Sequence, residues 1–140
     1  MANFLFNDAL TSIVKGEIDY LNDTIKVALY TTAPDIDADT YRSDLTGEAT
    51  GSGYTAGGVT LASKTVTTDD TNNRTVADAA DSQWTGLTTS FRYIVVYQST
   101  GVDATSRLIT CIDTGSTQTI SNGTYDVTWP AAGVFNFSNV

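Results

Sequence analysis

The sequence contains no histidine, a single cysteine and two prolines, and only 16% of its residues are charged. Without histidine the chain has no imidazole to act as a general base, and it lacks the commonest metal ligand in proteins. Because Cys111 is the only cysteine, an internal disulfide and a cysteine-based zinc site are excluded. We therefore expect a protein that is not an enzyme and that binds no cofactor.

Basic residues are also scarce, and long apolar runs are missing. Lys and Arg number 7 against 16 Asp and Glu, which gives a formal net charge of −9. Proteins that bind nucleic acid or an anionic membrane surface need clustered basic residues. No apolar run approaches the roughly 20 residues of a membrane span, and residues 1–5 lack the basic start of a signal peptide. We expect no nucleic-acid or membrane partner, and synthesis in a reducing cytoplasm.

Threonine fills the place left by charged residues, with 25 of the 140 positions. Threonine and tyrosine favour the half-buried surface of a pleated sheet over a helix. Asp outnumbers Glu by 14 to 2, and Asp prefers turns and helix caps whereas Glu prefers helix interiors. The composition therefore predicts a mainly β protein.

One segment has helical periodicity. Apolar residues recur at nearly 3.6-residue spacing from position 4 onward, with Asn3 placed to cap the start and Gly16 to end the helix. We expect a helix over about residues 4–16. The side chains expected to face the sheet are Leu10, Ile13 and Val14.

Strand-like alternation occupies most of the remaining chain. The predicted strands cover residues 24–30, 59–66, 91–97, 107–113, 124–129 and 134–137. Residues 74–80 fit either a helix or a short strand, and Thr75 and Val76 favour the strand. Residues 91–97 are apolar on both faces, so we expect a central strand whose second face the helix covers. Asn122-Gly123 predicts a hairpin turn. The expected fold is a single domain over residues 1–140, an antiparallel β-sandwich or partly open barrel with one N-terminal α-helix packed on the sheet.

Residues 33–57 form a long polar stretch without apolar periodicity, which we expect to be a surface loop. Its part from Pro34 to Gly53 is expected to lie at an interface in the assembled state. Alternate carboxylates at Asp35, Asp37 and Asp39 make a weak candidate for a calcium site, although an EF-hand loop would need Gly and Glu where Thr40 and Thr46 stand. A solvated acidic loop is the competing interpretation. Three tyrosines in turns or in this loop are candidate partner contacts: Tyr20, Tyr41 and Tyr54.

Asp113-Thr114-Gly115-Ser116 spells the signature of aspartic proteases. That chemistry needs two aspartates sharing one proton, and only 27 residues follow this copy. We interpret the segment as a strand that ends in an Asp-Thr-Gly turn.

The run from Ala9 to Tyr20, followed by Asp23-Thr24-Ile25-Lys26-Val27-Ala28-Leu29, resembles a family of small tailed-bacteriophage virion proteins. In these proteins a short helix leads through Gly-Glu-Ile-Asp-aromatic into an Asp-Thr-Ile-Lys-Val-Ala-Leu strand. Later segments also resemble this family, namely residues 54–58, the strand that ends at Tyr97, and residues 99–101, 106–109 and 112–114, so the resemblance covers most of the chain.

The resemblance implies a capsid decoration (cement) protein on the surface of the virion, with the major capsid protein as its partner. It brings no catalytic residue with it. A dimer or trimer is expected, because closed symmetric assemblies are the usual outcome of self-association. The same resemblance leaves open a tail or head-fibre component. A further alternative is an adhesion module that binds a host glycan or protein, with the acidic loop and its tyrosines as the contact surface.

Overall fold

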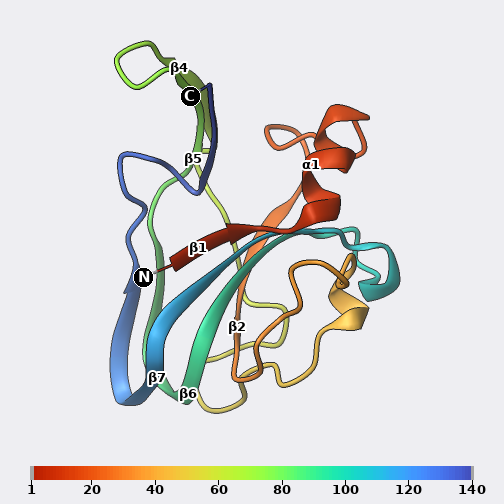
Figure 1. Cartoon of the computed structure of the whole chain (residues 1–140). Helices are drawn as coiled ribbons and strands as arrows, with labels where there is room; N and C mark the ends of the chain where they lie inside the picture. Colours follow the sequence, from red (N-terminus) through yellow and green to blue (C-terminus); the bar gives the residue numbers. More distant parts are fainter. Residues whose placement is uncertain (1, 140) are drawn as a thin grey trace.

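The structure, a computed structural model, describes residues 2–139 as two antiparallel sheets and one α-helix (Figure 1). The strand order is β1-β7-β6-β2-β3 in the larger sheet and β4-β5-β8 in the smaller. This confirms the predicted mainly β class, in the form of a sandwich or open barrel that does not close. The elements are β1 (Ala2–Leu5), α1 (Asn7–Val14), β2 (Ile25–Tyr30), η1 (Arg42–Asp44), β3 (Val59–Thr60), β4 (Thr65–Asp69), β5 (Arg74–Asp78), β6 (Ser82–Gln98), η2 (Asp103–Thr105), β7 (Leu108–Val127) and β8 (Phe135–Ser138).

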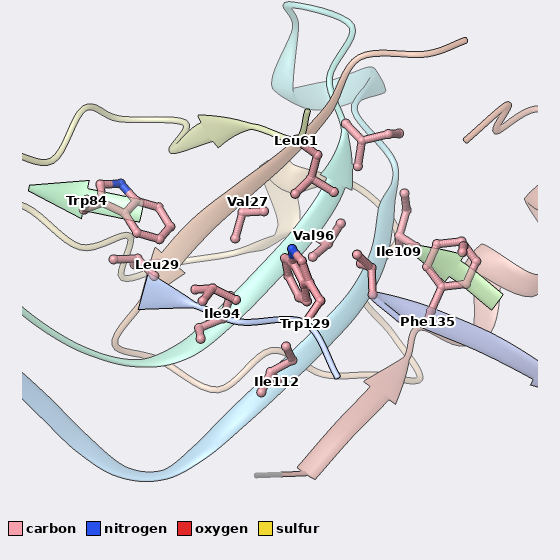
Figure 2. Close-up of a cluster of buried hydrophobic side chains, with 14 of the residues drawn as sticks. Val27, Leu29, Leu61, Trp84, Ile94, Val96, Ile109, Ile112, Trp129 and Phe135 are labelled. Carbon is pink, nitrogen blue, oxygen red and sulfur yellow. The ribbon is translucent and has the colours of Figure 1, made fainter. Parts of the chain in front are cut away.

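One apolar cluster fills the space between the two sheets. β2 contributes Ile25, Val27 and Leu29, every second residue, as the alternating pattern predicts. The smaller sheet contributes Ala77 and Phe135. Figure 2 shows side chains of this cluster converging from both sheets and from the segments beside them. The predicted domain spans 1–140, and Met1 and Val140 lie outside the described residues.

The second face of the larger sheet carries a separate apolar cluster. Val95 and Tyr97 of β6 point to this face, whereas Ile94 and Val96 point to the first. Ala9 of α1 joins the second cluster and is 1% exposed. The prediction that the helix covers the second face of a central strand is therefore confirmed.

The helix is shorter than the predicted 4–16 and begins later. Residues 2–5 instead form β1, which pairs with β7 so that Asn3 lies opposite Ile112. The residue before the first turn is Phe6, and the Asn3 amide donates a hydrogen bond to the Val134 carbonyl at 3.1 Å, so the prediction of Asn3 as N-cap is wrong. Pairing with β7 satisfies the backbone groups of residues 2–5 without a helix.

The later start changes which side chains of α1 face the sheet. Leu10 is 41% exposed and Val14 is 88% exposed, so the prediction that they point inward is wrong. Ala9 and Ser12 are buried in their place. Gly16 has a φ of +76° just after the helix, and its predicted role as the terminator is confirmed.

β6 and β7 are longer than the pattern predicts, and β7 alone contains most of the two predicted strands 107–113 and 124–129. Asn122 has the positive φ of a hairpin turn, 47°, yet it lies within β7. Its backbone N–H donates a hydrogen bond to the Thr88 hydroxyl of β6 at 2.9 Å, where the pairing shifts register. The predicted hairpin turn at Asn122-Gly123 is wrong, because a bulge makes the same demand for positive φ as a turn. The predicted strand 59–66 is also interrupted, since it is divided between β3 and β4.

Candidate interaction surface

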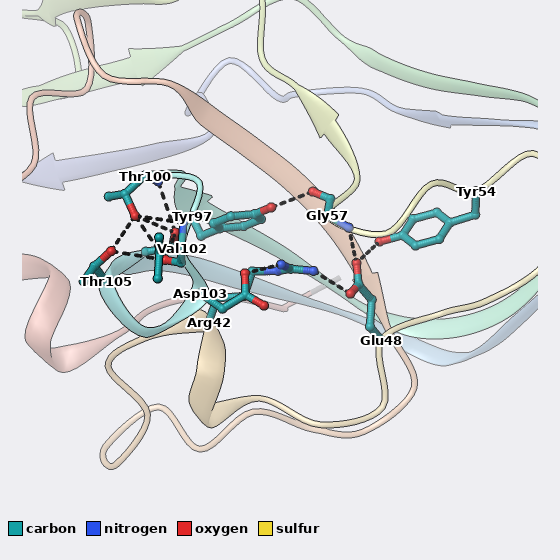
Figure 3. A network of polar contacts seen from close by, with 10 residues as sticks. Arg42, Glu48, Tyr54, Gly57, Tyr97, Thr100, Val102, Asp103 and Thr105 are labelled. Carbon is teal, nitrogen blue, oxygen red and sulfur yellow. Dashed lines mark hydrogen bonds and ion pairs between the residues drawn. The ribbon is translucent and has the colours of Figure 1, made fainter.

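Arg42, the first residue of η1, lies at the centre of a network of charges and hydrogen bonds (Figure 3). Its guanidinium contacts the carboxylates of Glu48 and Asp103, each at 2.5 Å. Glu48 also accepts hydrogen bonds from the Tyr54 hydroxyl at 2.9 Å and from the Gly57 backbone N–H at 2.6 Å. The Arg42 and Glu48 side chains are only 13% and 21% exposed. Charges buried to this extent need partners, and here each has the other.

This network fastens the long polar stretch 33–57 to the larger sheet. The Tyr97 hydroxyl of β6 donates a hydrogen bond to the Gly57 carbonyl at 2.7 Å, and the Arg42 guanidinium lies 5.3 Å from the centre of the Tyr97 ring. Within the stretch, Ala49 is 3% exposed and belongs to the main core. Most of the stretch is exposed or half-buried, as expected of a surface loop, and Ala49 anchors it in the core. The stretch packs on the larger sheet, and Ala49 supplies an apolar contact for this packing.

The three candidate tyrosines occupy different environments, and none of them is fully exposed. Tyr20 is 7% exposed, and its hydroxyl donates a hydrogen bond to the Asp78 carbonyl at 2.9 Å. Tyr54 is half-buried, and its hydroxyl accepts a hydrogen bond from the Leu29 backbone N–H at 3.0 Å. Burial raises the pKa of both tyrosines above the ordinary value.

Tyr41 is also half-buried, with the guanidinium of Arg107 at 5.2 Å from the centre of its ring. The expectation of an exposed contact is wrong most clearly for Tyr20, because its ring packs edge-to-face on Phe135 at 5.2 Å between centroids. Partner contact through Tyr41 and Tyr54 stays a prediction.

The carboxylates of Asp35, Asp37 and Asp39 do not converge on a common point. Asp35 accepts hydrogen bonds from the backbone N–H groups of residues 37 and 38, and Asp39 accepts one from that of residue 35. Asp37 accepts a hydrogen bond from the Asn7 amide at 2.7 Å. Across residues 2–139, no three Asp, Glu, Cys or His side chains form a group that would hold a metal ion. These aspartates shape a turn and join it to the start of α1.

Asp113 lies in the middle of β7, not at the end of a strand as the sequence suggests. Between the pairs Phe91–Gln118 and Tyr93–Asp113, β7 carries extra residues that β6 lacks. The Asp113 carboxylate accepts hydrogen bonds from the Arg92 guanidinium at 2.8 and 3.1 Å. These bonds, helped by the Gly115 N–H, hold the pKa of Asp113 below its usual value. A carboxylate held ionised by a guanidinium differs from the proton-sharing pair of an aspartic protease.

An apolar groove lies between the end of α1 and one face of the smaller sheet. Its volume is about 110 Å³. Val66 of β4 and Phe137 of β8 line it with 44% and 36% of their areas exposed. Because these two exposed side chains adjoin one groove, we take the groove as a candidate interaction surface. The groove is lined by Ile13, Ile18, Tyr20, Val66, Thr75, Ala77, Phe135 and Phe137.

A second hollow, which we call the aromatic cavity, opens beside the last residues of β7. Its volume is about 280 Å³. Tyr125 and Trp129 provide ring surfaces, while Asp126 and Asn3 add polar groups. Asp126 is exposed and accepts a hydrogen bond from the Gln83 amide at 2.7 Å. Ring faces beside carboxylate and amide groups can bind a small polar ligand that has an apolar face.

Sequence reasoning missed both hollows and the ion pair between Arg42 and Glu48. Val66 and Phe137 fall within the predicted strands 59–66 and 134–137, and nothing in those patterns indicated that they line a groove. A single apolar residue among threonines in β4 was the available signal of a surface strand. Comparison with protein-family models, curated proteins and solved structures finds no match to this chain. None of the helices within residues 2–139 is long and apolar enough to cross a membrane.

Proposed function

We propose that this protein is a non-enzymatic structural component of a bacteriophage virion, which binds the outside of the capsid and stabilises it. The observation that carries the proposal is the apolar groove, whose Val66 and Phe137 stay exposed in the isolated chain. The sequence resemblance to small virion proteins supplies the partner, the major capsid protein. A net charge of −9 supports the proposal as well, because it opposes adhesion to DNA during assembly.

The mechanism we propose is mass action on the assembled shell. A protein that binds the shell and not the dissociated subunits stabilises each site by RT ln(1 + [L]/Kd), about 2.7 kcal/mol at a hundredfold excess over Kd. Many symmetry-related copies make the total large. In this mechanism the groove receives apolar side chains of the capsid surface, and no bond is made or broken.

A matched pair of variants tests the role of the groove. Phe137→Ser removes an aromatic ring from the groove, whereas Phe4→Ser removes one from β1, where Phe4 is 48% exposed and does not line the groove. We expect Phe137→Ser to lose co-sedimentation with empty shells of the major capsid protein, and Phe4→Ser to keep it. Thermal melting of both variants checks that they fold. Equal binding by both variants would contradict the proposal.

The role in the particle is tested by comparing virions with and without the protein after heating, chelation and osmotic shock. We expect virions that lack it to release DNA under milder conditions. Equal survival, together with density for this chain at the tail or at a fibre tip, would overturn the capsid role.

The aromatic cavity favours a second candidate, a head-fibre or tail adhesion module that binds a host glycan. Tyr125 offers a ring face and Asp126 a hydrogen-bond acceptor, the two features that sugar recognition uses. Host cell-wall oligosaccharides titrated into the protein would quench the fluorescence of Trp129 if this function is correct. Asp126→Ala should abolish that signal and leave shell binding unchanged. The absence of quenching would remove this candidate.

A further inference from the structure

β4 is the outermost strand of the smaller sheet. It pairs with β5 through all five residues, from Thr65 opposite Asp78 to Asp69 opposite Arg74, without a break in register. Its other edge faces no strand of the described chain. Residues 65–68 are all exposed, so side chains on both faces of β4 contact water. An edge strand of this kind presents a row of backbone N–H and C=O groups that can pair with another strand.

The sequence of β4 lacks the features that usually protect a sheet edge. Natural edges are shortened, bulged, interrupted by proline, charged at the centre or covered by another segment. β3, at one edge of the larger sheet, has only two residues. β4 has five residues in regular register, with its charges confined to Asp69 and the preceding Lys64. Its central residues are threonine and valine, whose branched side chains favour strand pairing.

We propose that β4 pairs with β4 of a second copy of this chain, antiparallel and across a two-fold axis at Thr67. The two smaller sheets would thereby join into one six-stranded sheet. In this register Thr67 faces Thr67 of the second copy, and Val66 faces Thr68. Lys64, whose ammonium contacts the Asp23 carbonyl of its own chain, then lies opposite Asp70 of the second copy, and Thr65 lies opposite Asp69, so no like charges face each other.

We propose a second copy of this chain as the partner because the free edge of β4 is self-complementary. Pairing β4 with itself buries both free edges and closes the assembly at two chains. Pairing β4 with a different edge of another copy would leave one edge free on each side and would generate an open filament. The antiparallel register also separates the two Asp69 carboxylates, which a parallel alignment would place side by side.

The contact is small, and this sets the expected affinity. Stable complexes bury about 1,200–2,000 Å² in total, more than one five-residue edge supplies. The dimer should therefore be weak in solution and should populate with rising protein concentration. Edge pairing uses backbone groups and leaves the strand faces free, so the groove stays open. The inference does not rest on the proposed capsid role, and its tests need no capsid.

Disulfide trapping tests the register. Cys111, the natural cysteine, is buried, and burial raises its pKa to about 12, so it will not compete at pH 8. In Thr67→Cys the two thiols face each other across the axis. In Thr65→Cys they are four residues apart along the strands, roughly 13 Å, too far for a disulfide. We expect mild oxidation to cross-link Thr67→Cys as a dimer and to leave Thr65→Cys monomeric. Equal cross-linking of the two variants, or none of either, would overturn the proposal.

A charge-matched pair tests the same axis without cross-linking. Thr67→Lys places two ammonium groups opposite each other, whereas Thr65→Lys places its ammonium opposite Asp69 of the second copy. Both positions are exposed on the same face of β4, so both variants should fold alike, as circular dichroism would check. By sedimentation equilibrium we expect Thr67→Lys to weaken dimerisation about fivefold or more, and Thr65→Lys to retain or strengthen it. A wild-type chain that stays monomeric at every concentration, or that forms filaments, would contradict the two-fold pairing.

Discussion

Asp113 faces Arg92 where the strands β6 and β7 lose their regular register. The carboxylate is ionised at neutral pH, and hydrogen bonds from Arg92 and the Gly115 N–H lower its pKa in the folded state. A carboxyl whose folded pKa is depressed stabilises the fold above its unfolded pKa of about 3.9. That contribution is lost as the pH falls through the folded pKa.

We therefore predict that Asp113→Asn lowers the melting temperature at pH 7. The difference from wild type should shrink as the pH falls below about 4, where the wild-type carboxyl also becomes protonated. Differential scanning calorimetry over a pH series measures this convergence. A difference that stays constant down to pH 2 would show that the ion pair with Arg92 is not its cause.

Arg42 and Glu48 form an ion pair that is largely shielded from water. Arg42→Met leaves the Glu48 carboxylate buried without its cation, and we predict a loss of roughly 1.5–3 kcal/mol in the free energy of unfolding. Arg107→Met is the matched control, because the Arg107 pairs with Asp8 and Glu17 are longer, at 3.3 Å, and both acids are 39% exposed. For this control we expect a loss of about 0–1 kcal/mol. Urea denaturation of both variants gives the comparison, and equal losses would contradict it.

At the scale of the elements, the segment of α1 packs on the sheet through Phe6, just before the helix, and through Ala9. The exposed side chains Leu10 and Val14 do not take part in this packing. Phe6, just before the helix, is fully buried in the cluster on the second face of the sheet. We predict that Phe6→Ala costs about 3–5 kcal/mol. Leu10→Ala should change stability by less than about 0.5 kcal/mol, as for other surface positions. Urea denaturation of the two variants tests this, and a large loss for Leu10→Ala would mean that α1 packs differently.

Much of the fold was predictable because strand periodicity depends on local sequence. The alternation in residues 24–30 correctly predicts β2, and the two apolar faces of residues 91–97 correctly predict a covered central strand. The start of α1 was not predictable in this way. Phe4 and Leu5 fit the helical pattern by themselves, and residues 2–5 become a strand only because β7, more than 100 residues later, offers an open edge.

The candidate surface was harder to predict than the elements. Tyr20 reads as an exposed turn residue, yet the smaller sheet folds over it and Phe135 packs against its ring. The apolar groove joins residues from α1, β4 and β8, which are distant in the sequence. Burial at such positions depends on contacts between distant parts of the chain, which local periodicity does not predict.

At the scale of the whole molecule, the two sheets share a single core. Ala77 and Phe135 of the smaller sheet lie in the same cluster as Ile25 and Val96 of the larger one. Figure 1 shows the smaller sheet extending beyond the larger at one end of the molecule, so its outer part has few neighbours. Whether it unfolds alone depends on how much of its stability comes from the shared core.

We predict that both sheets unfold in one cooperative transition, because separating them would expose the buried faces of Ala77 and Phe135 to water. Far-UV circular dichroism and the fluorescence of Trp84 and Trp129, both within the shared core, should therefore give coincident urea curves. Phe135→Ala should lower the free energy of unfolding by about 3–5 kcal/mol in both signals. If the smaller sheet were held only by its own ladder, hydrogen exchange of β5 would be much faster than that of β6, and Phe135→Ala would leave the exchange of β6 unchanged. That result would make the smaller sheet, which carries the apolar groove and the free edge of β4, an independently mobile attachment.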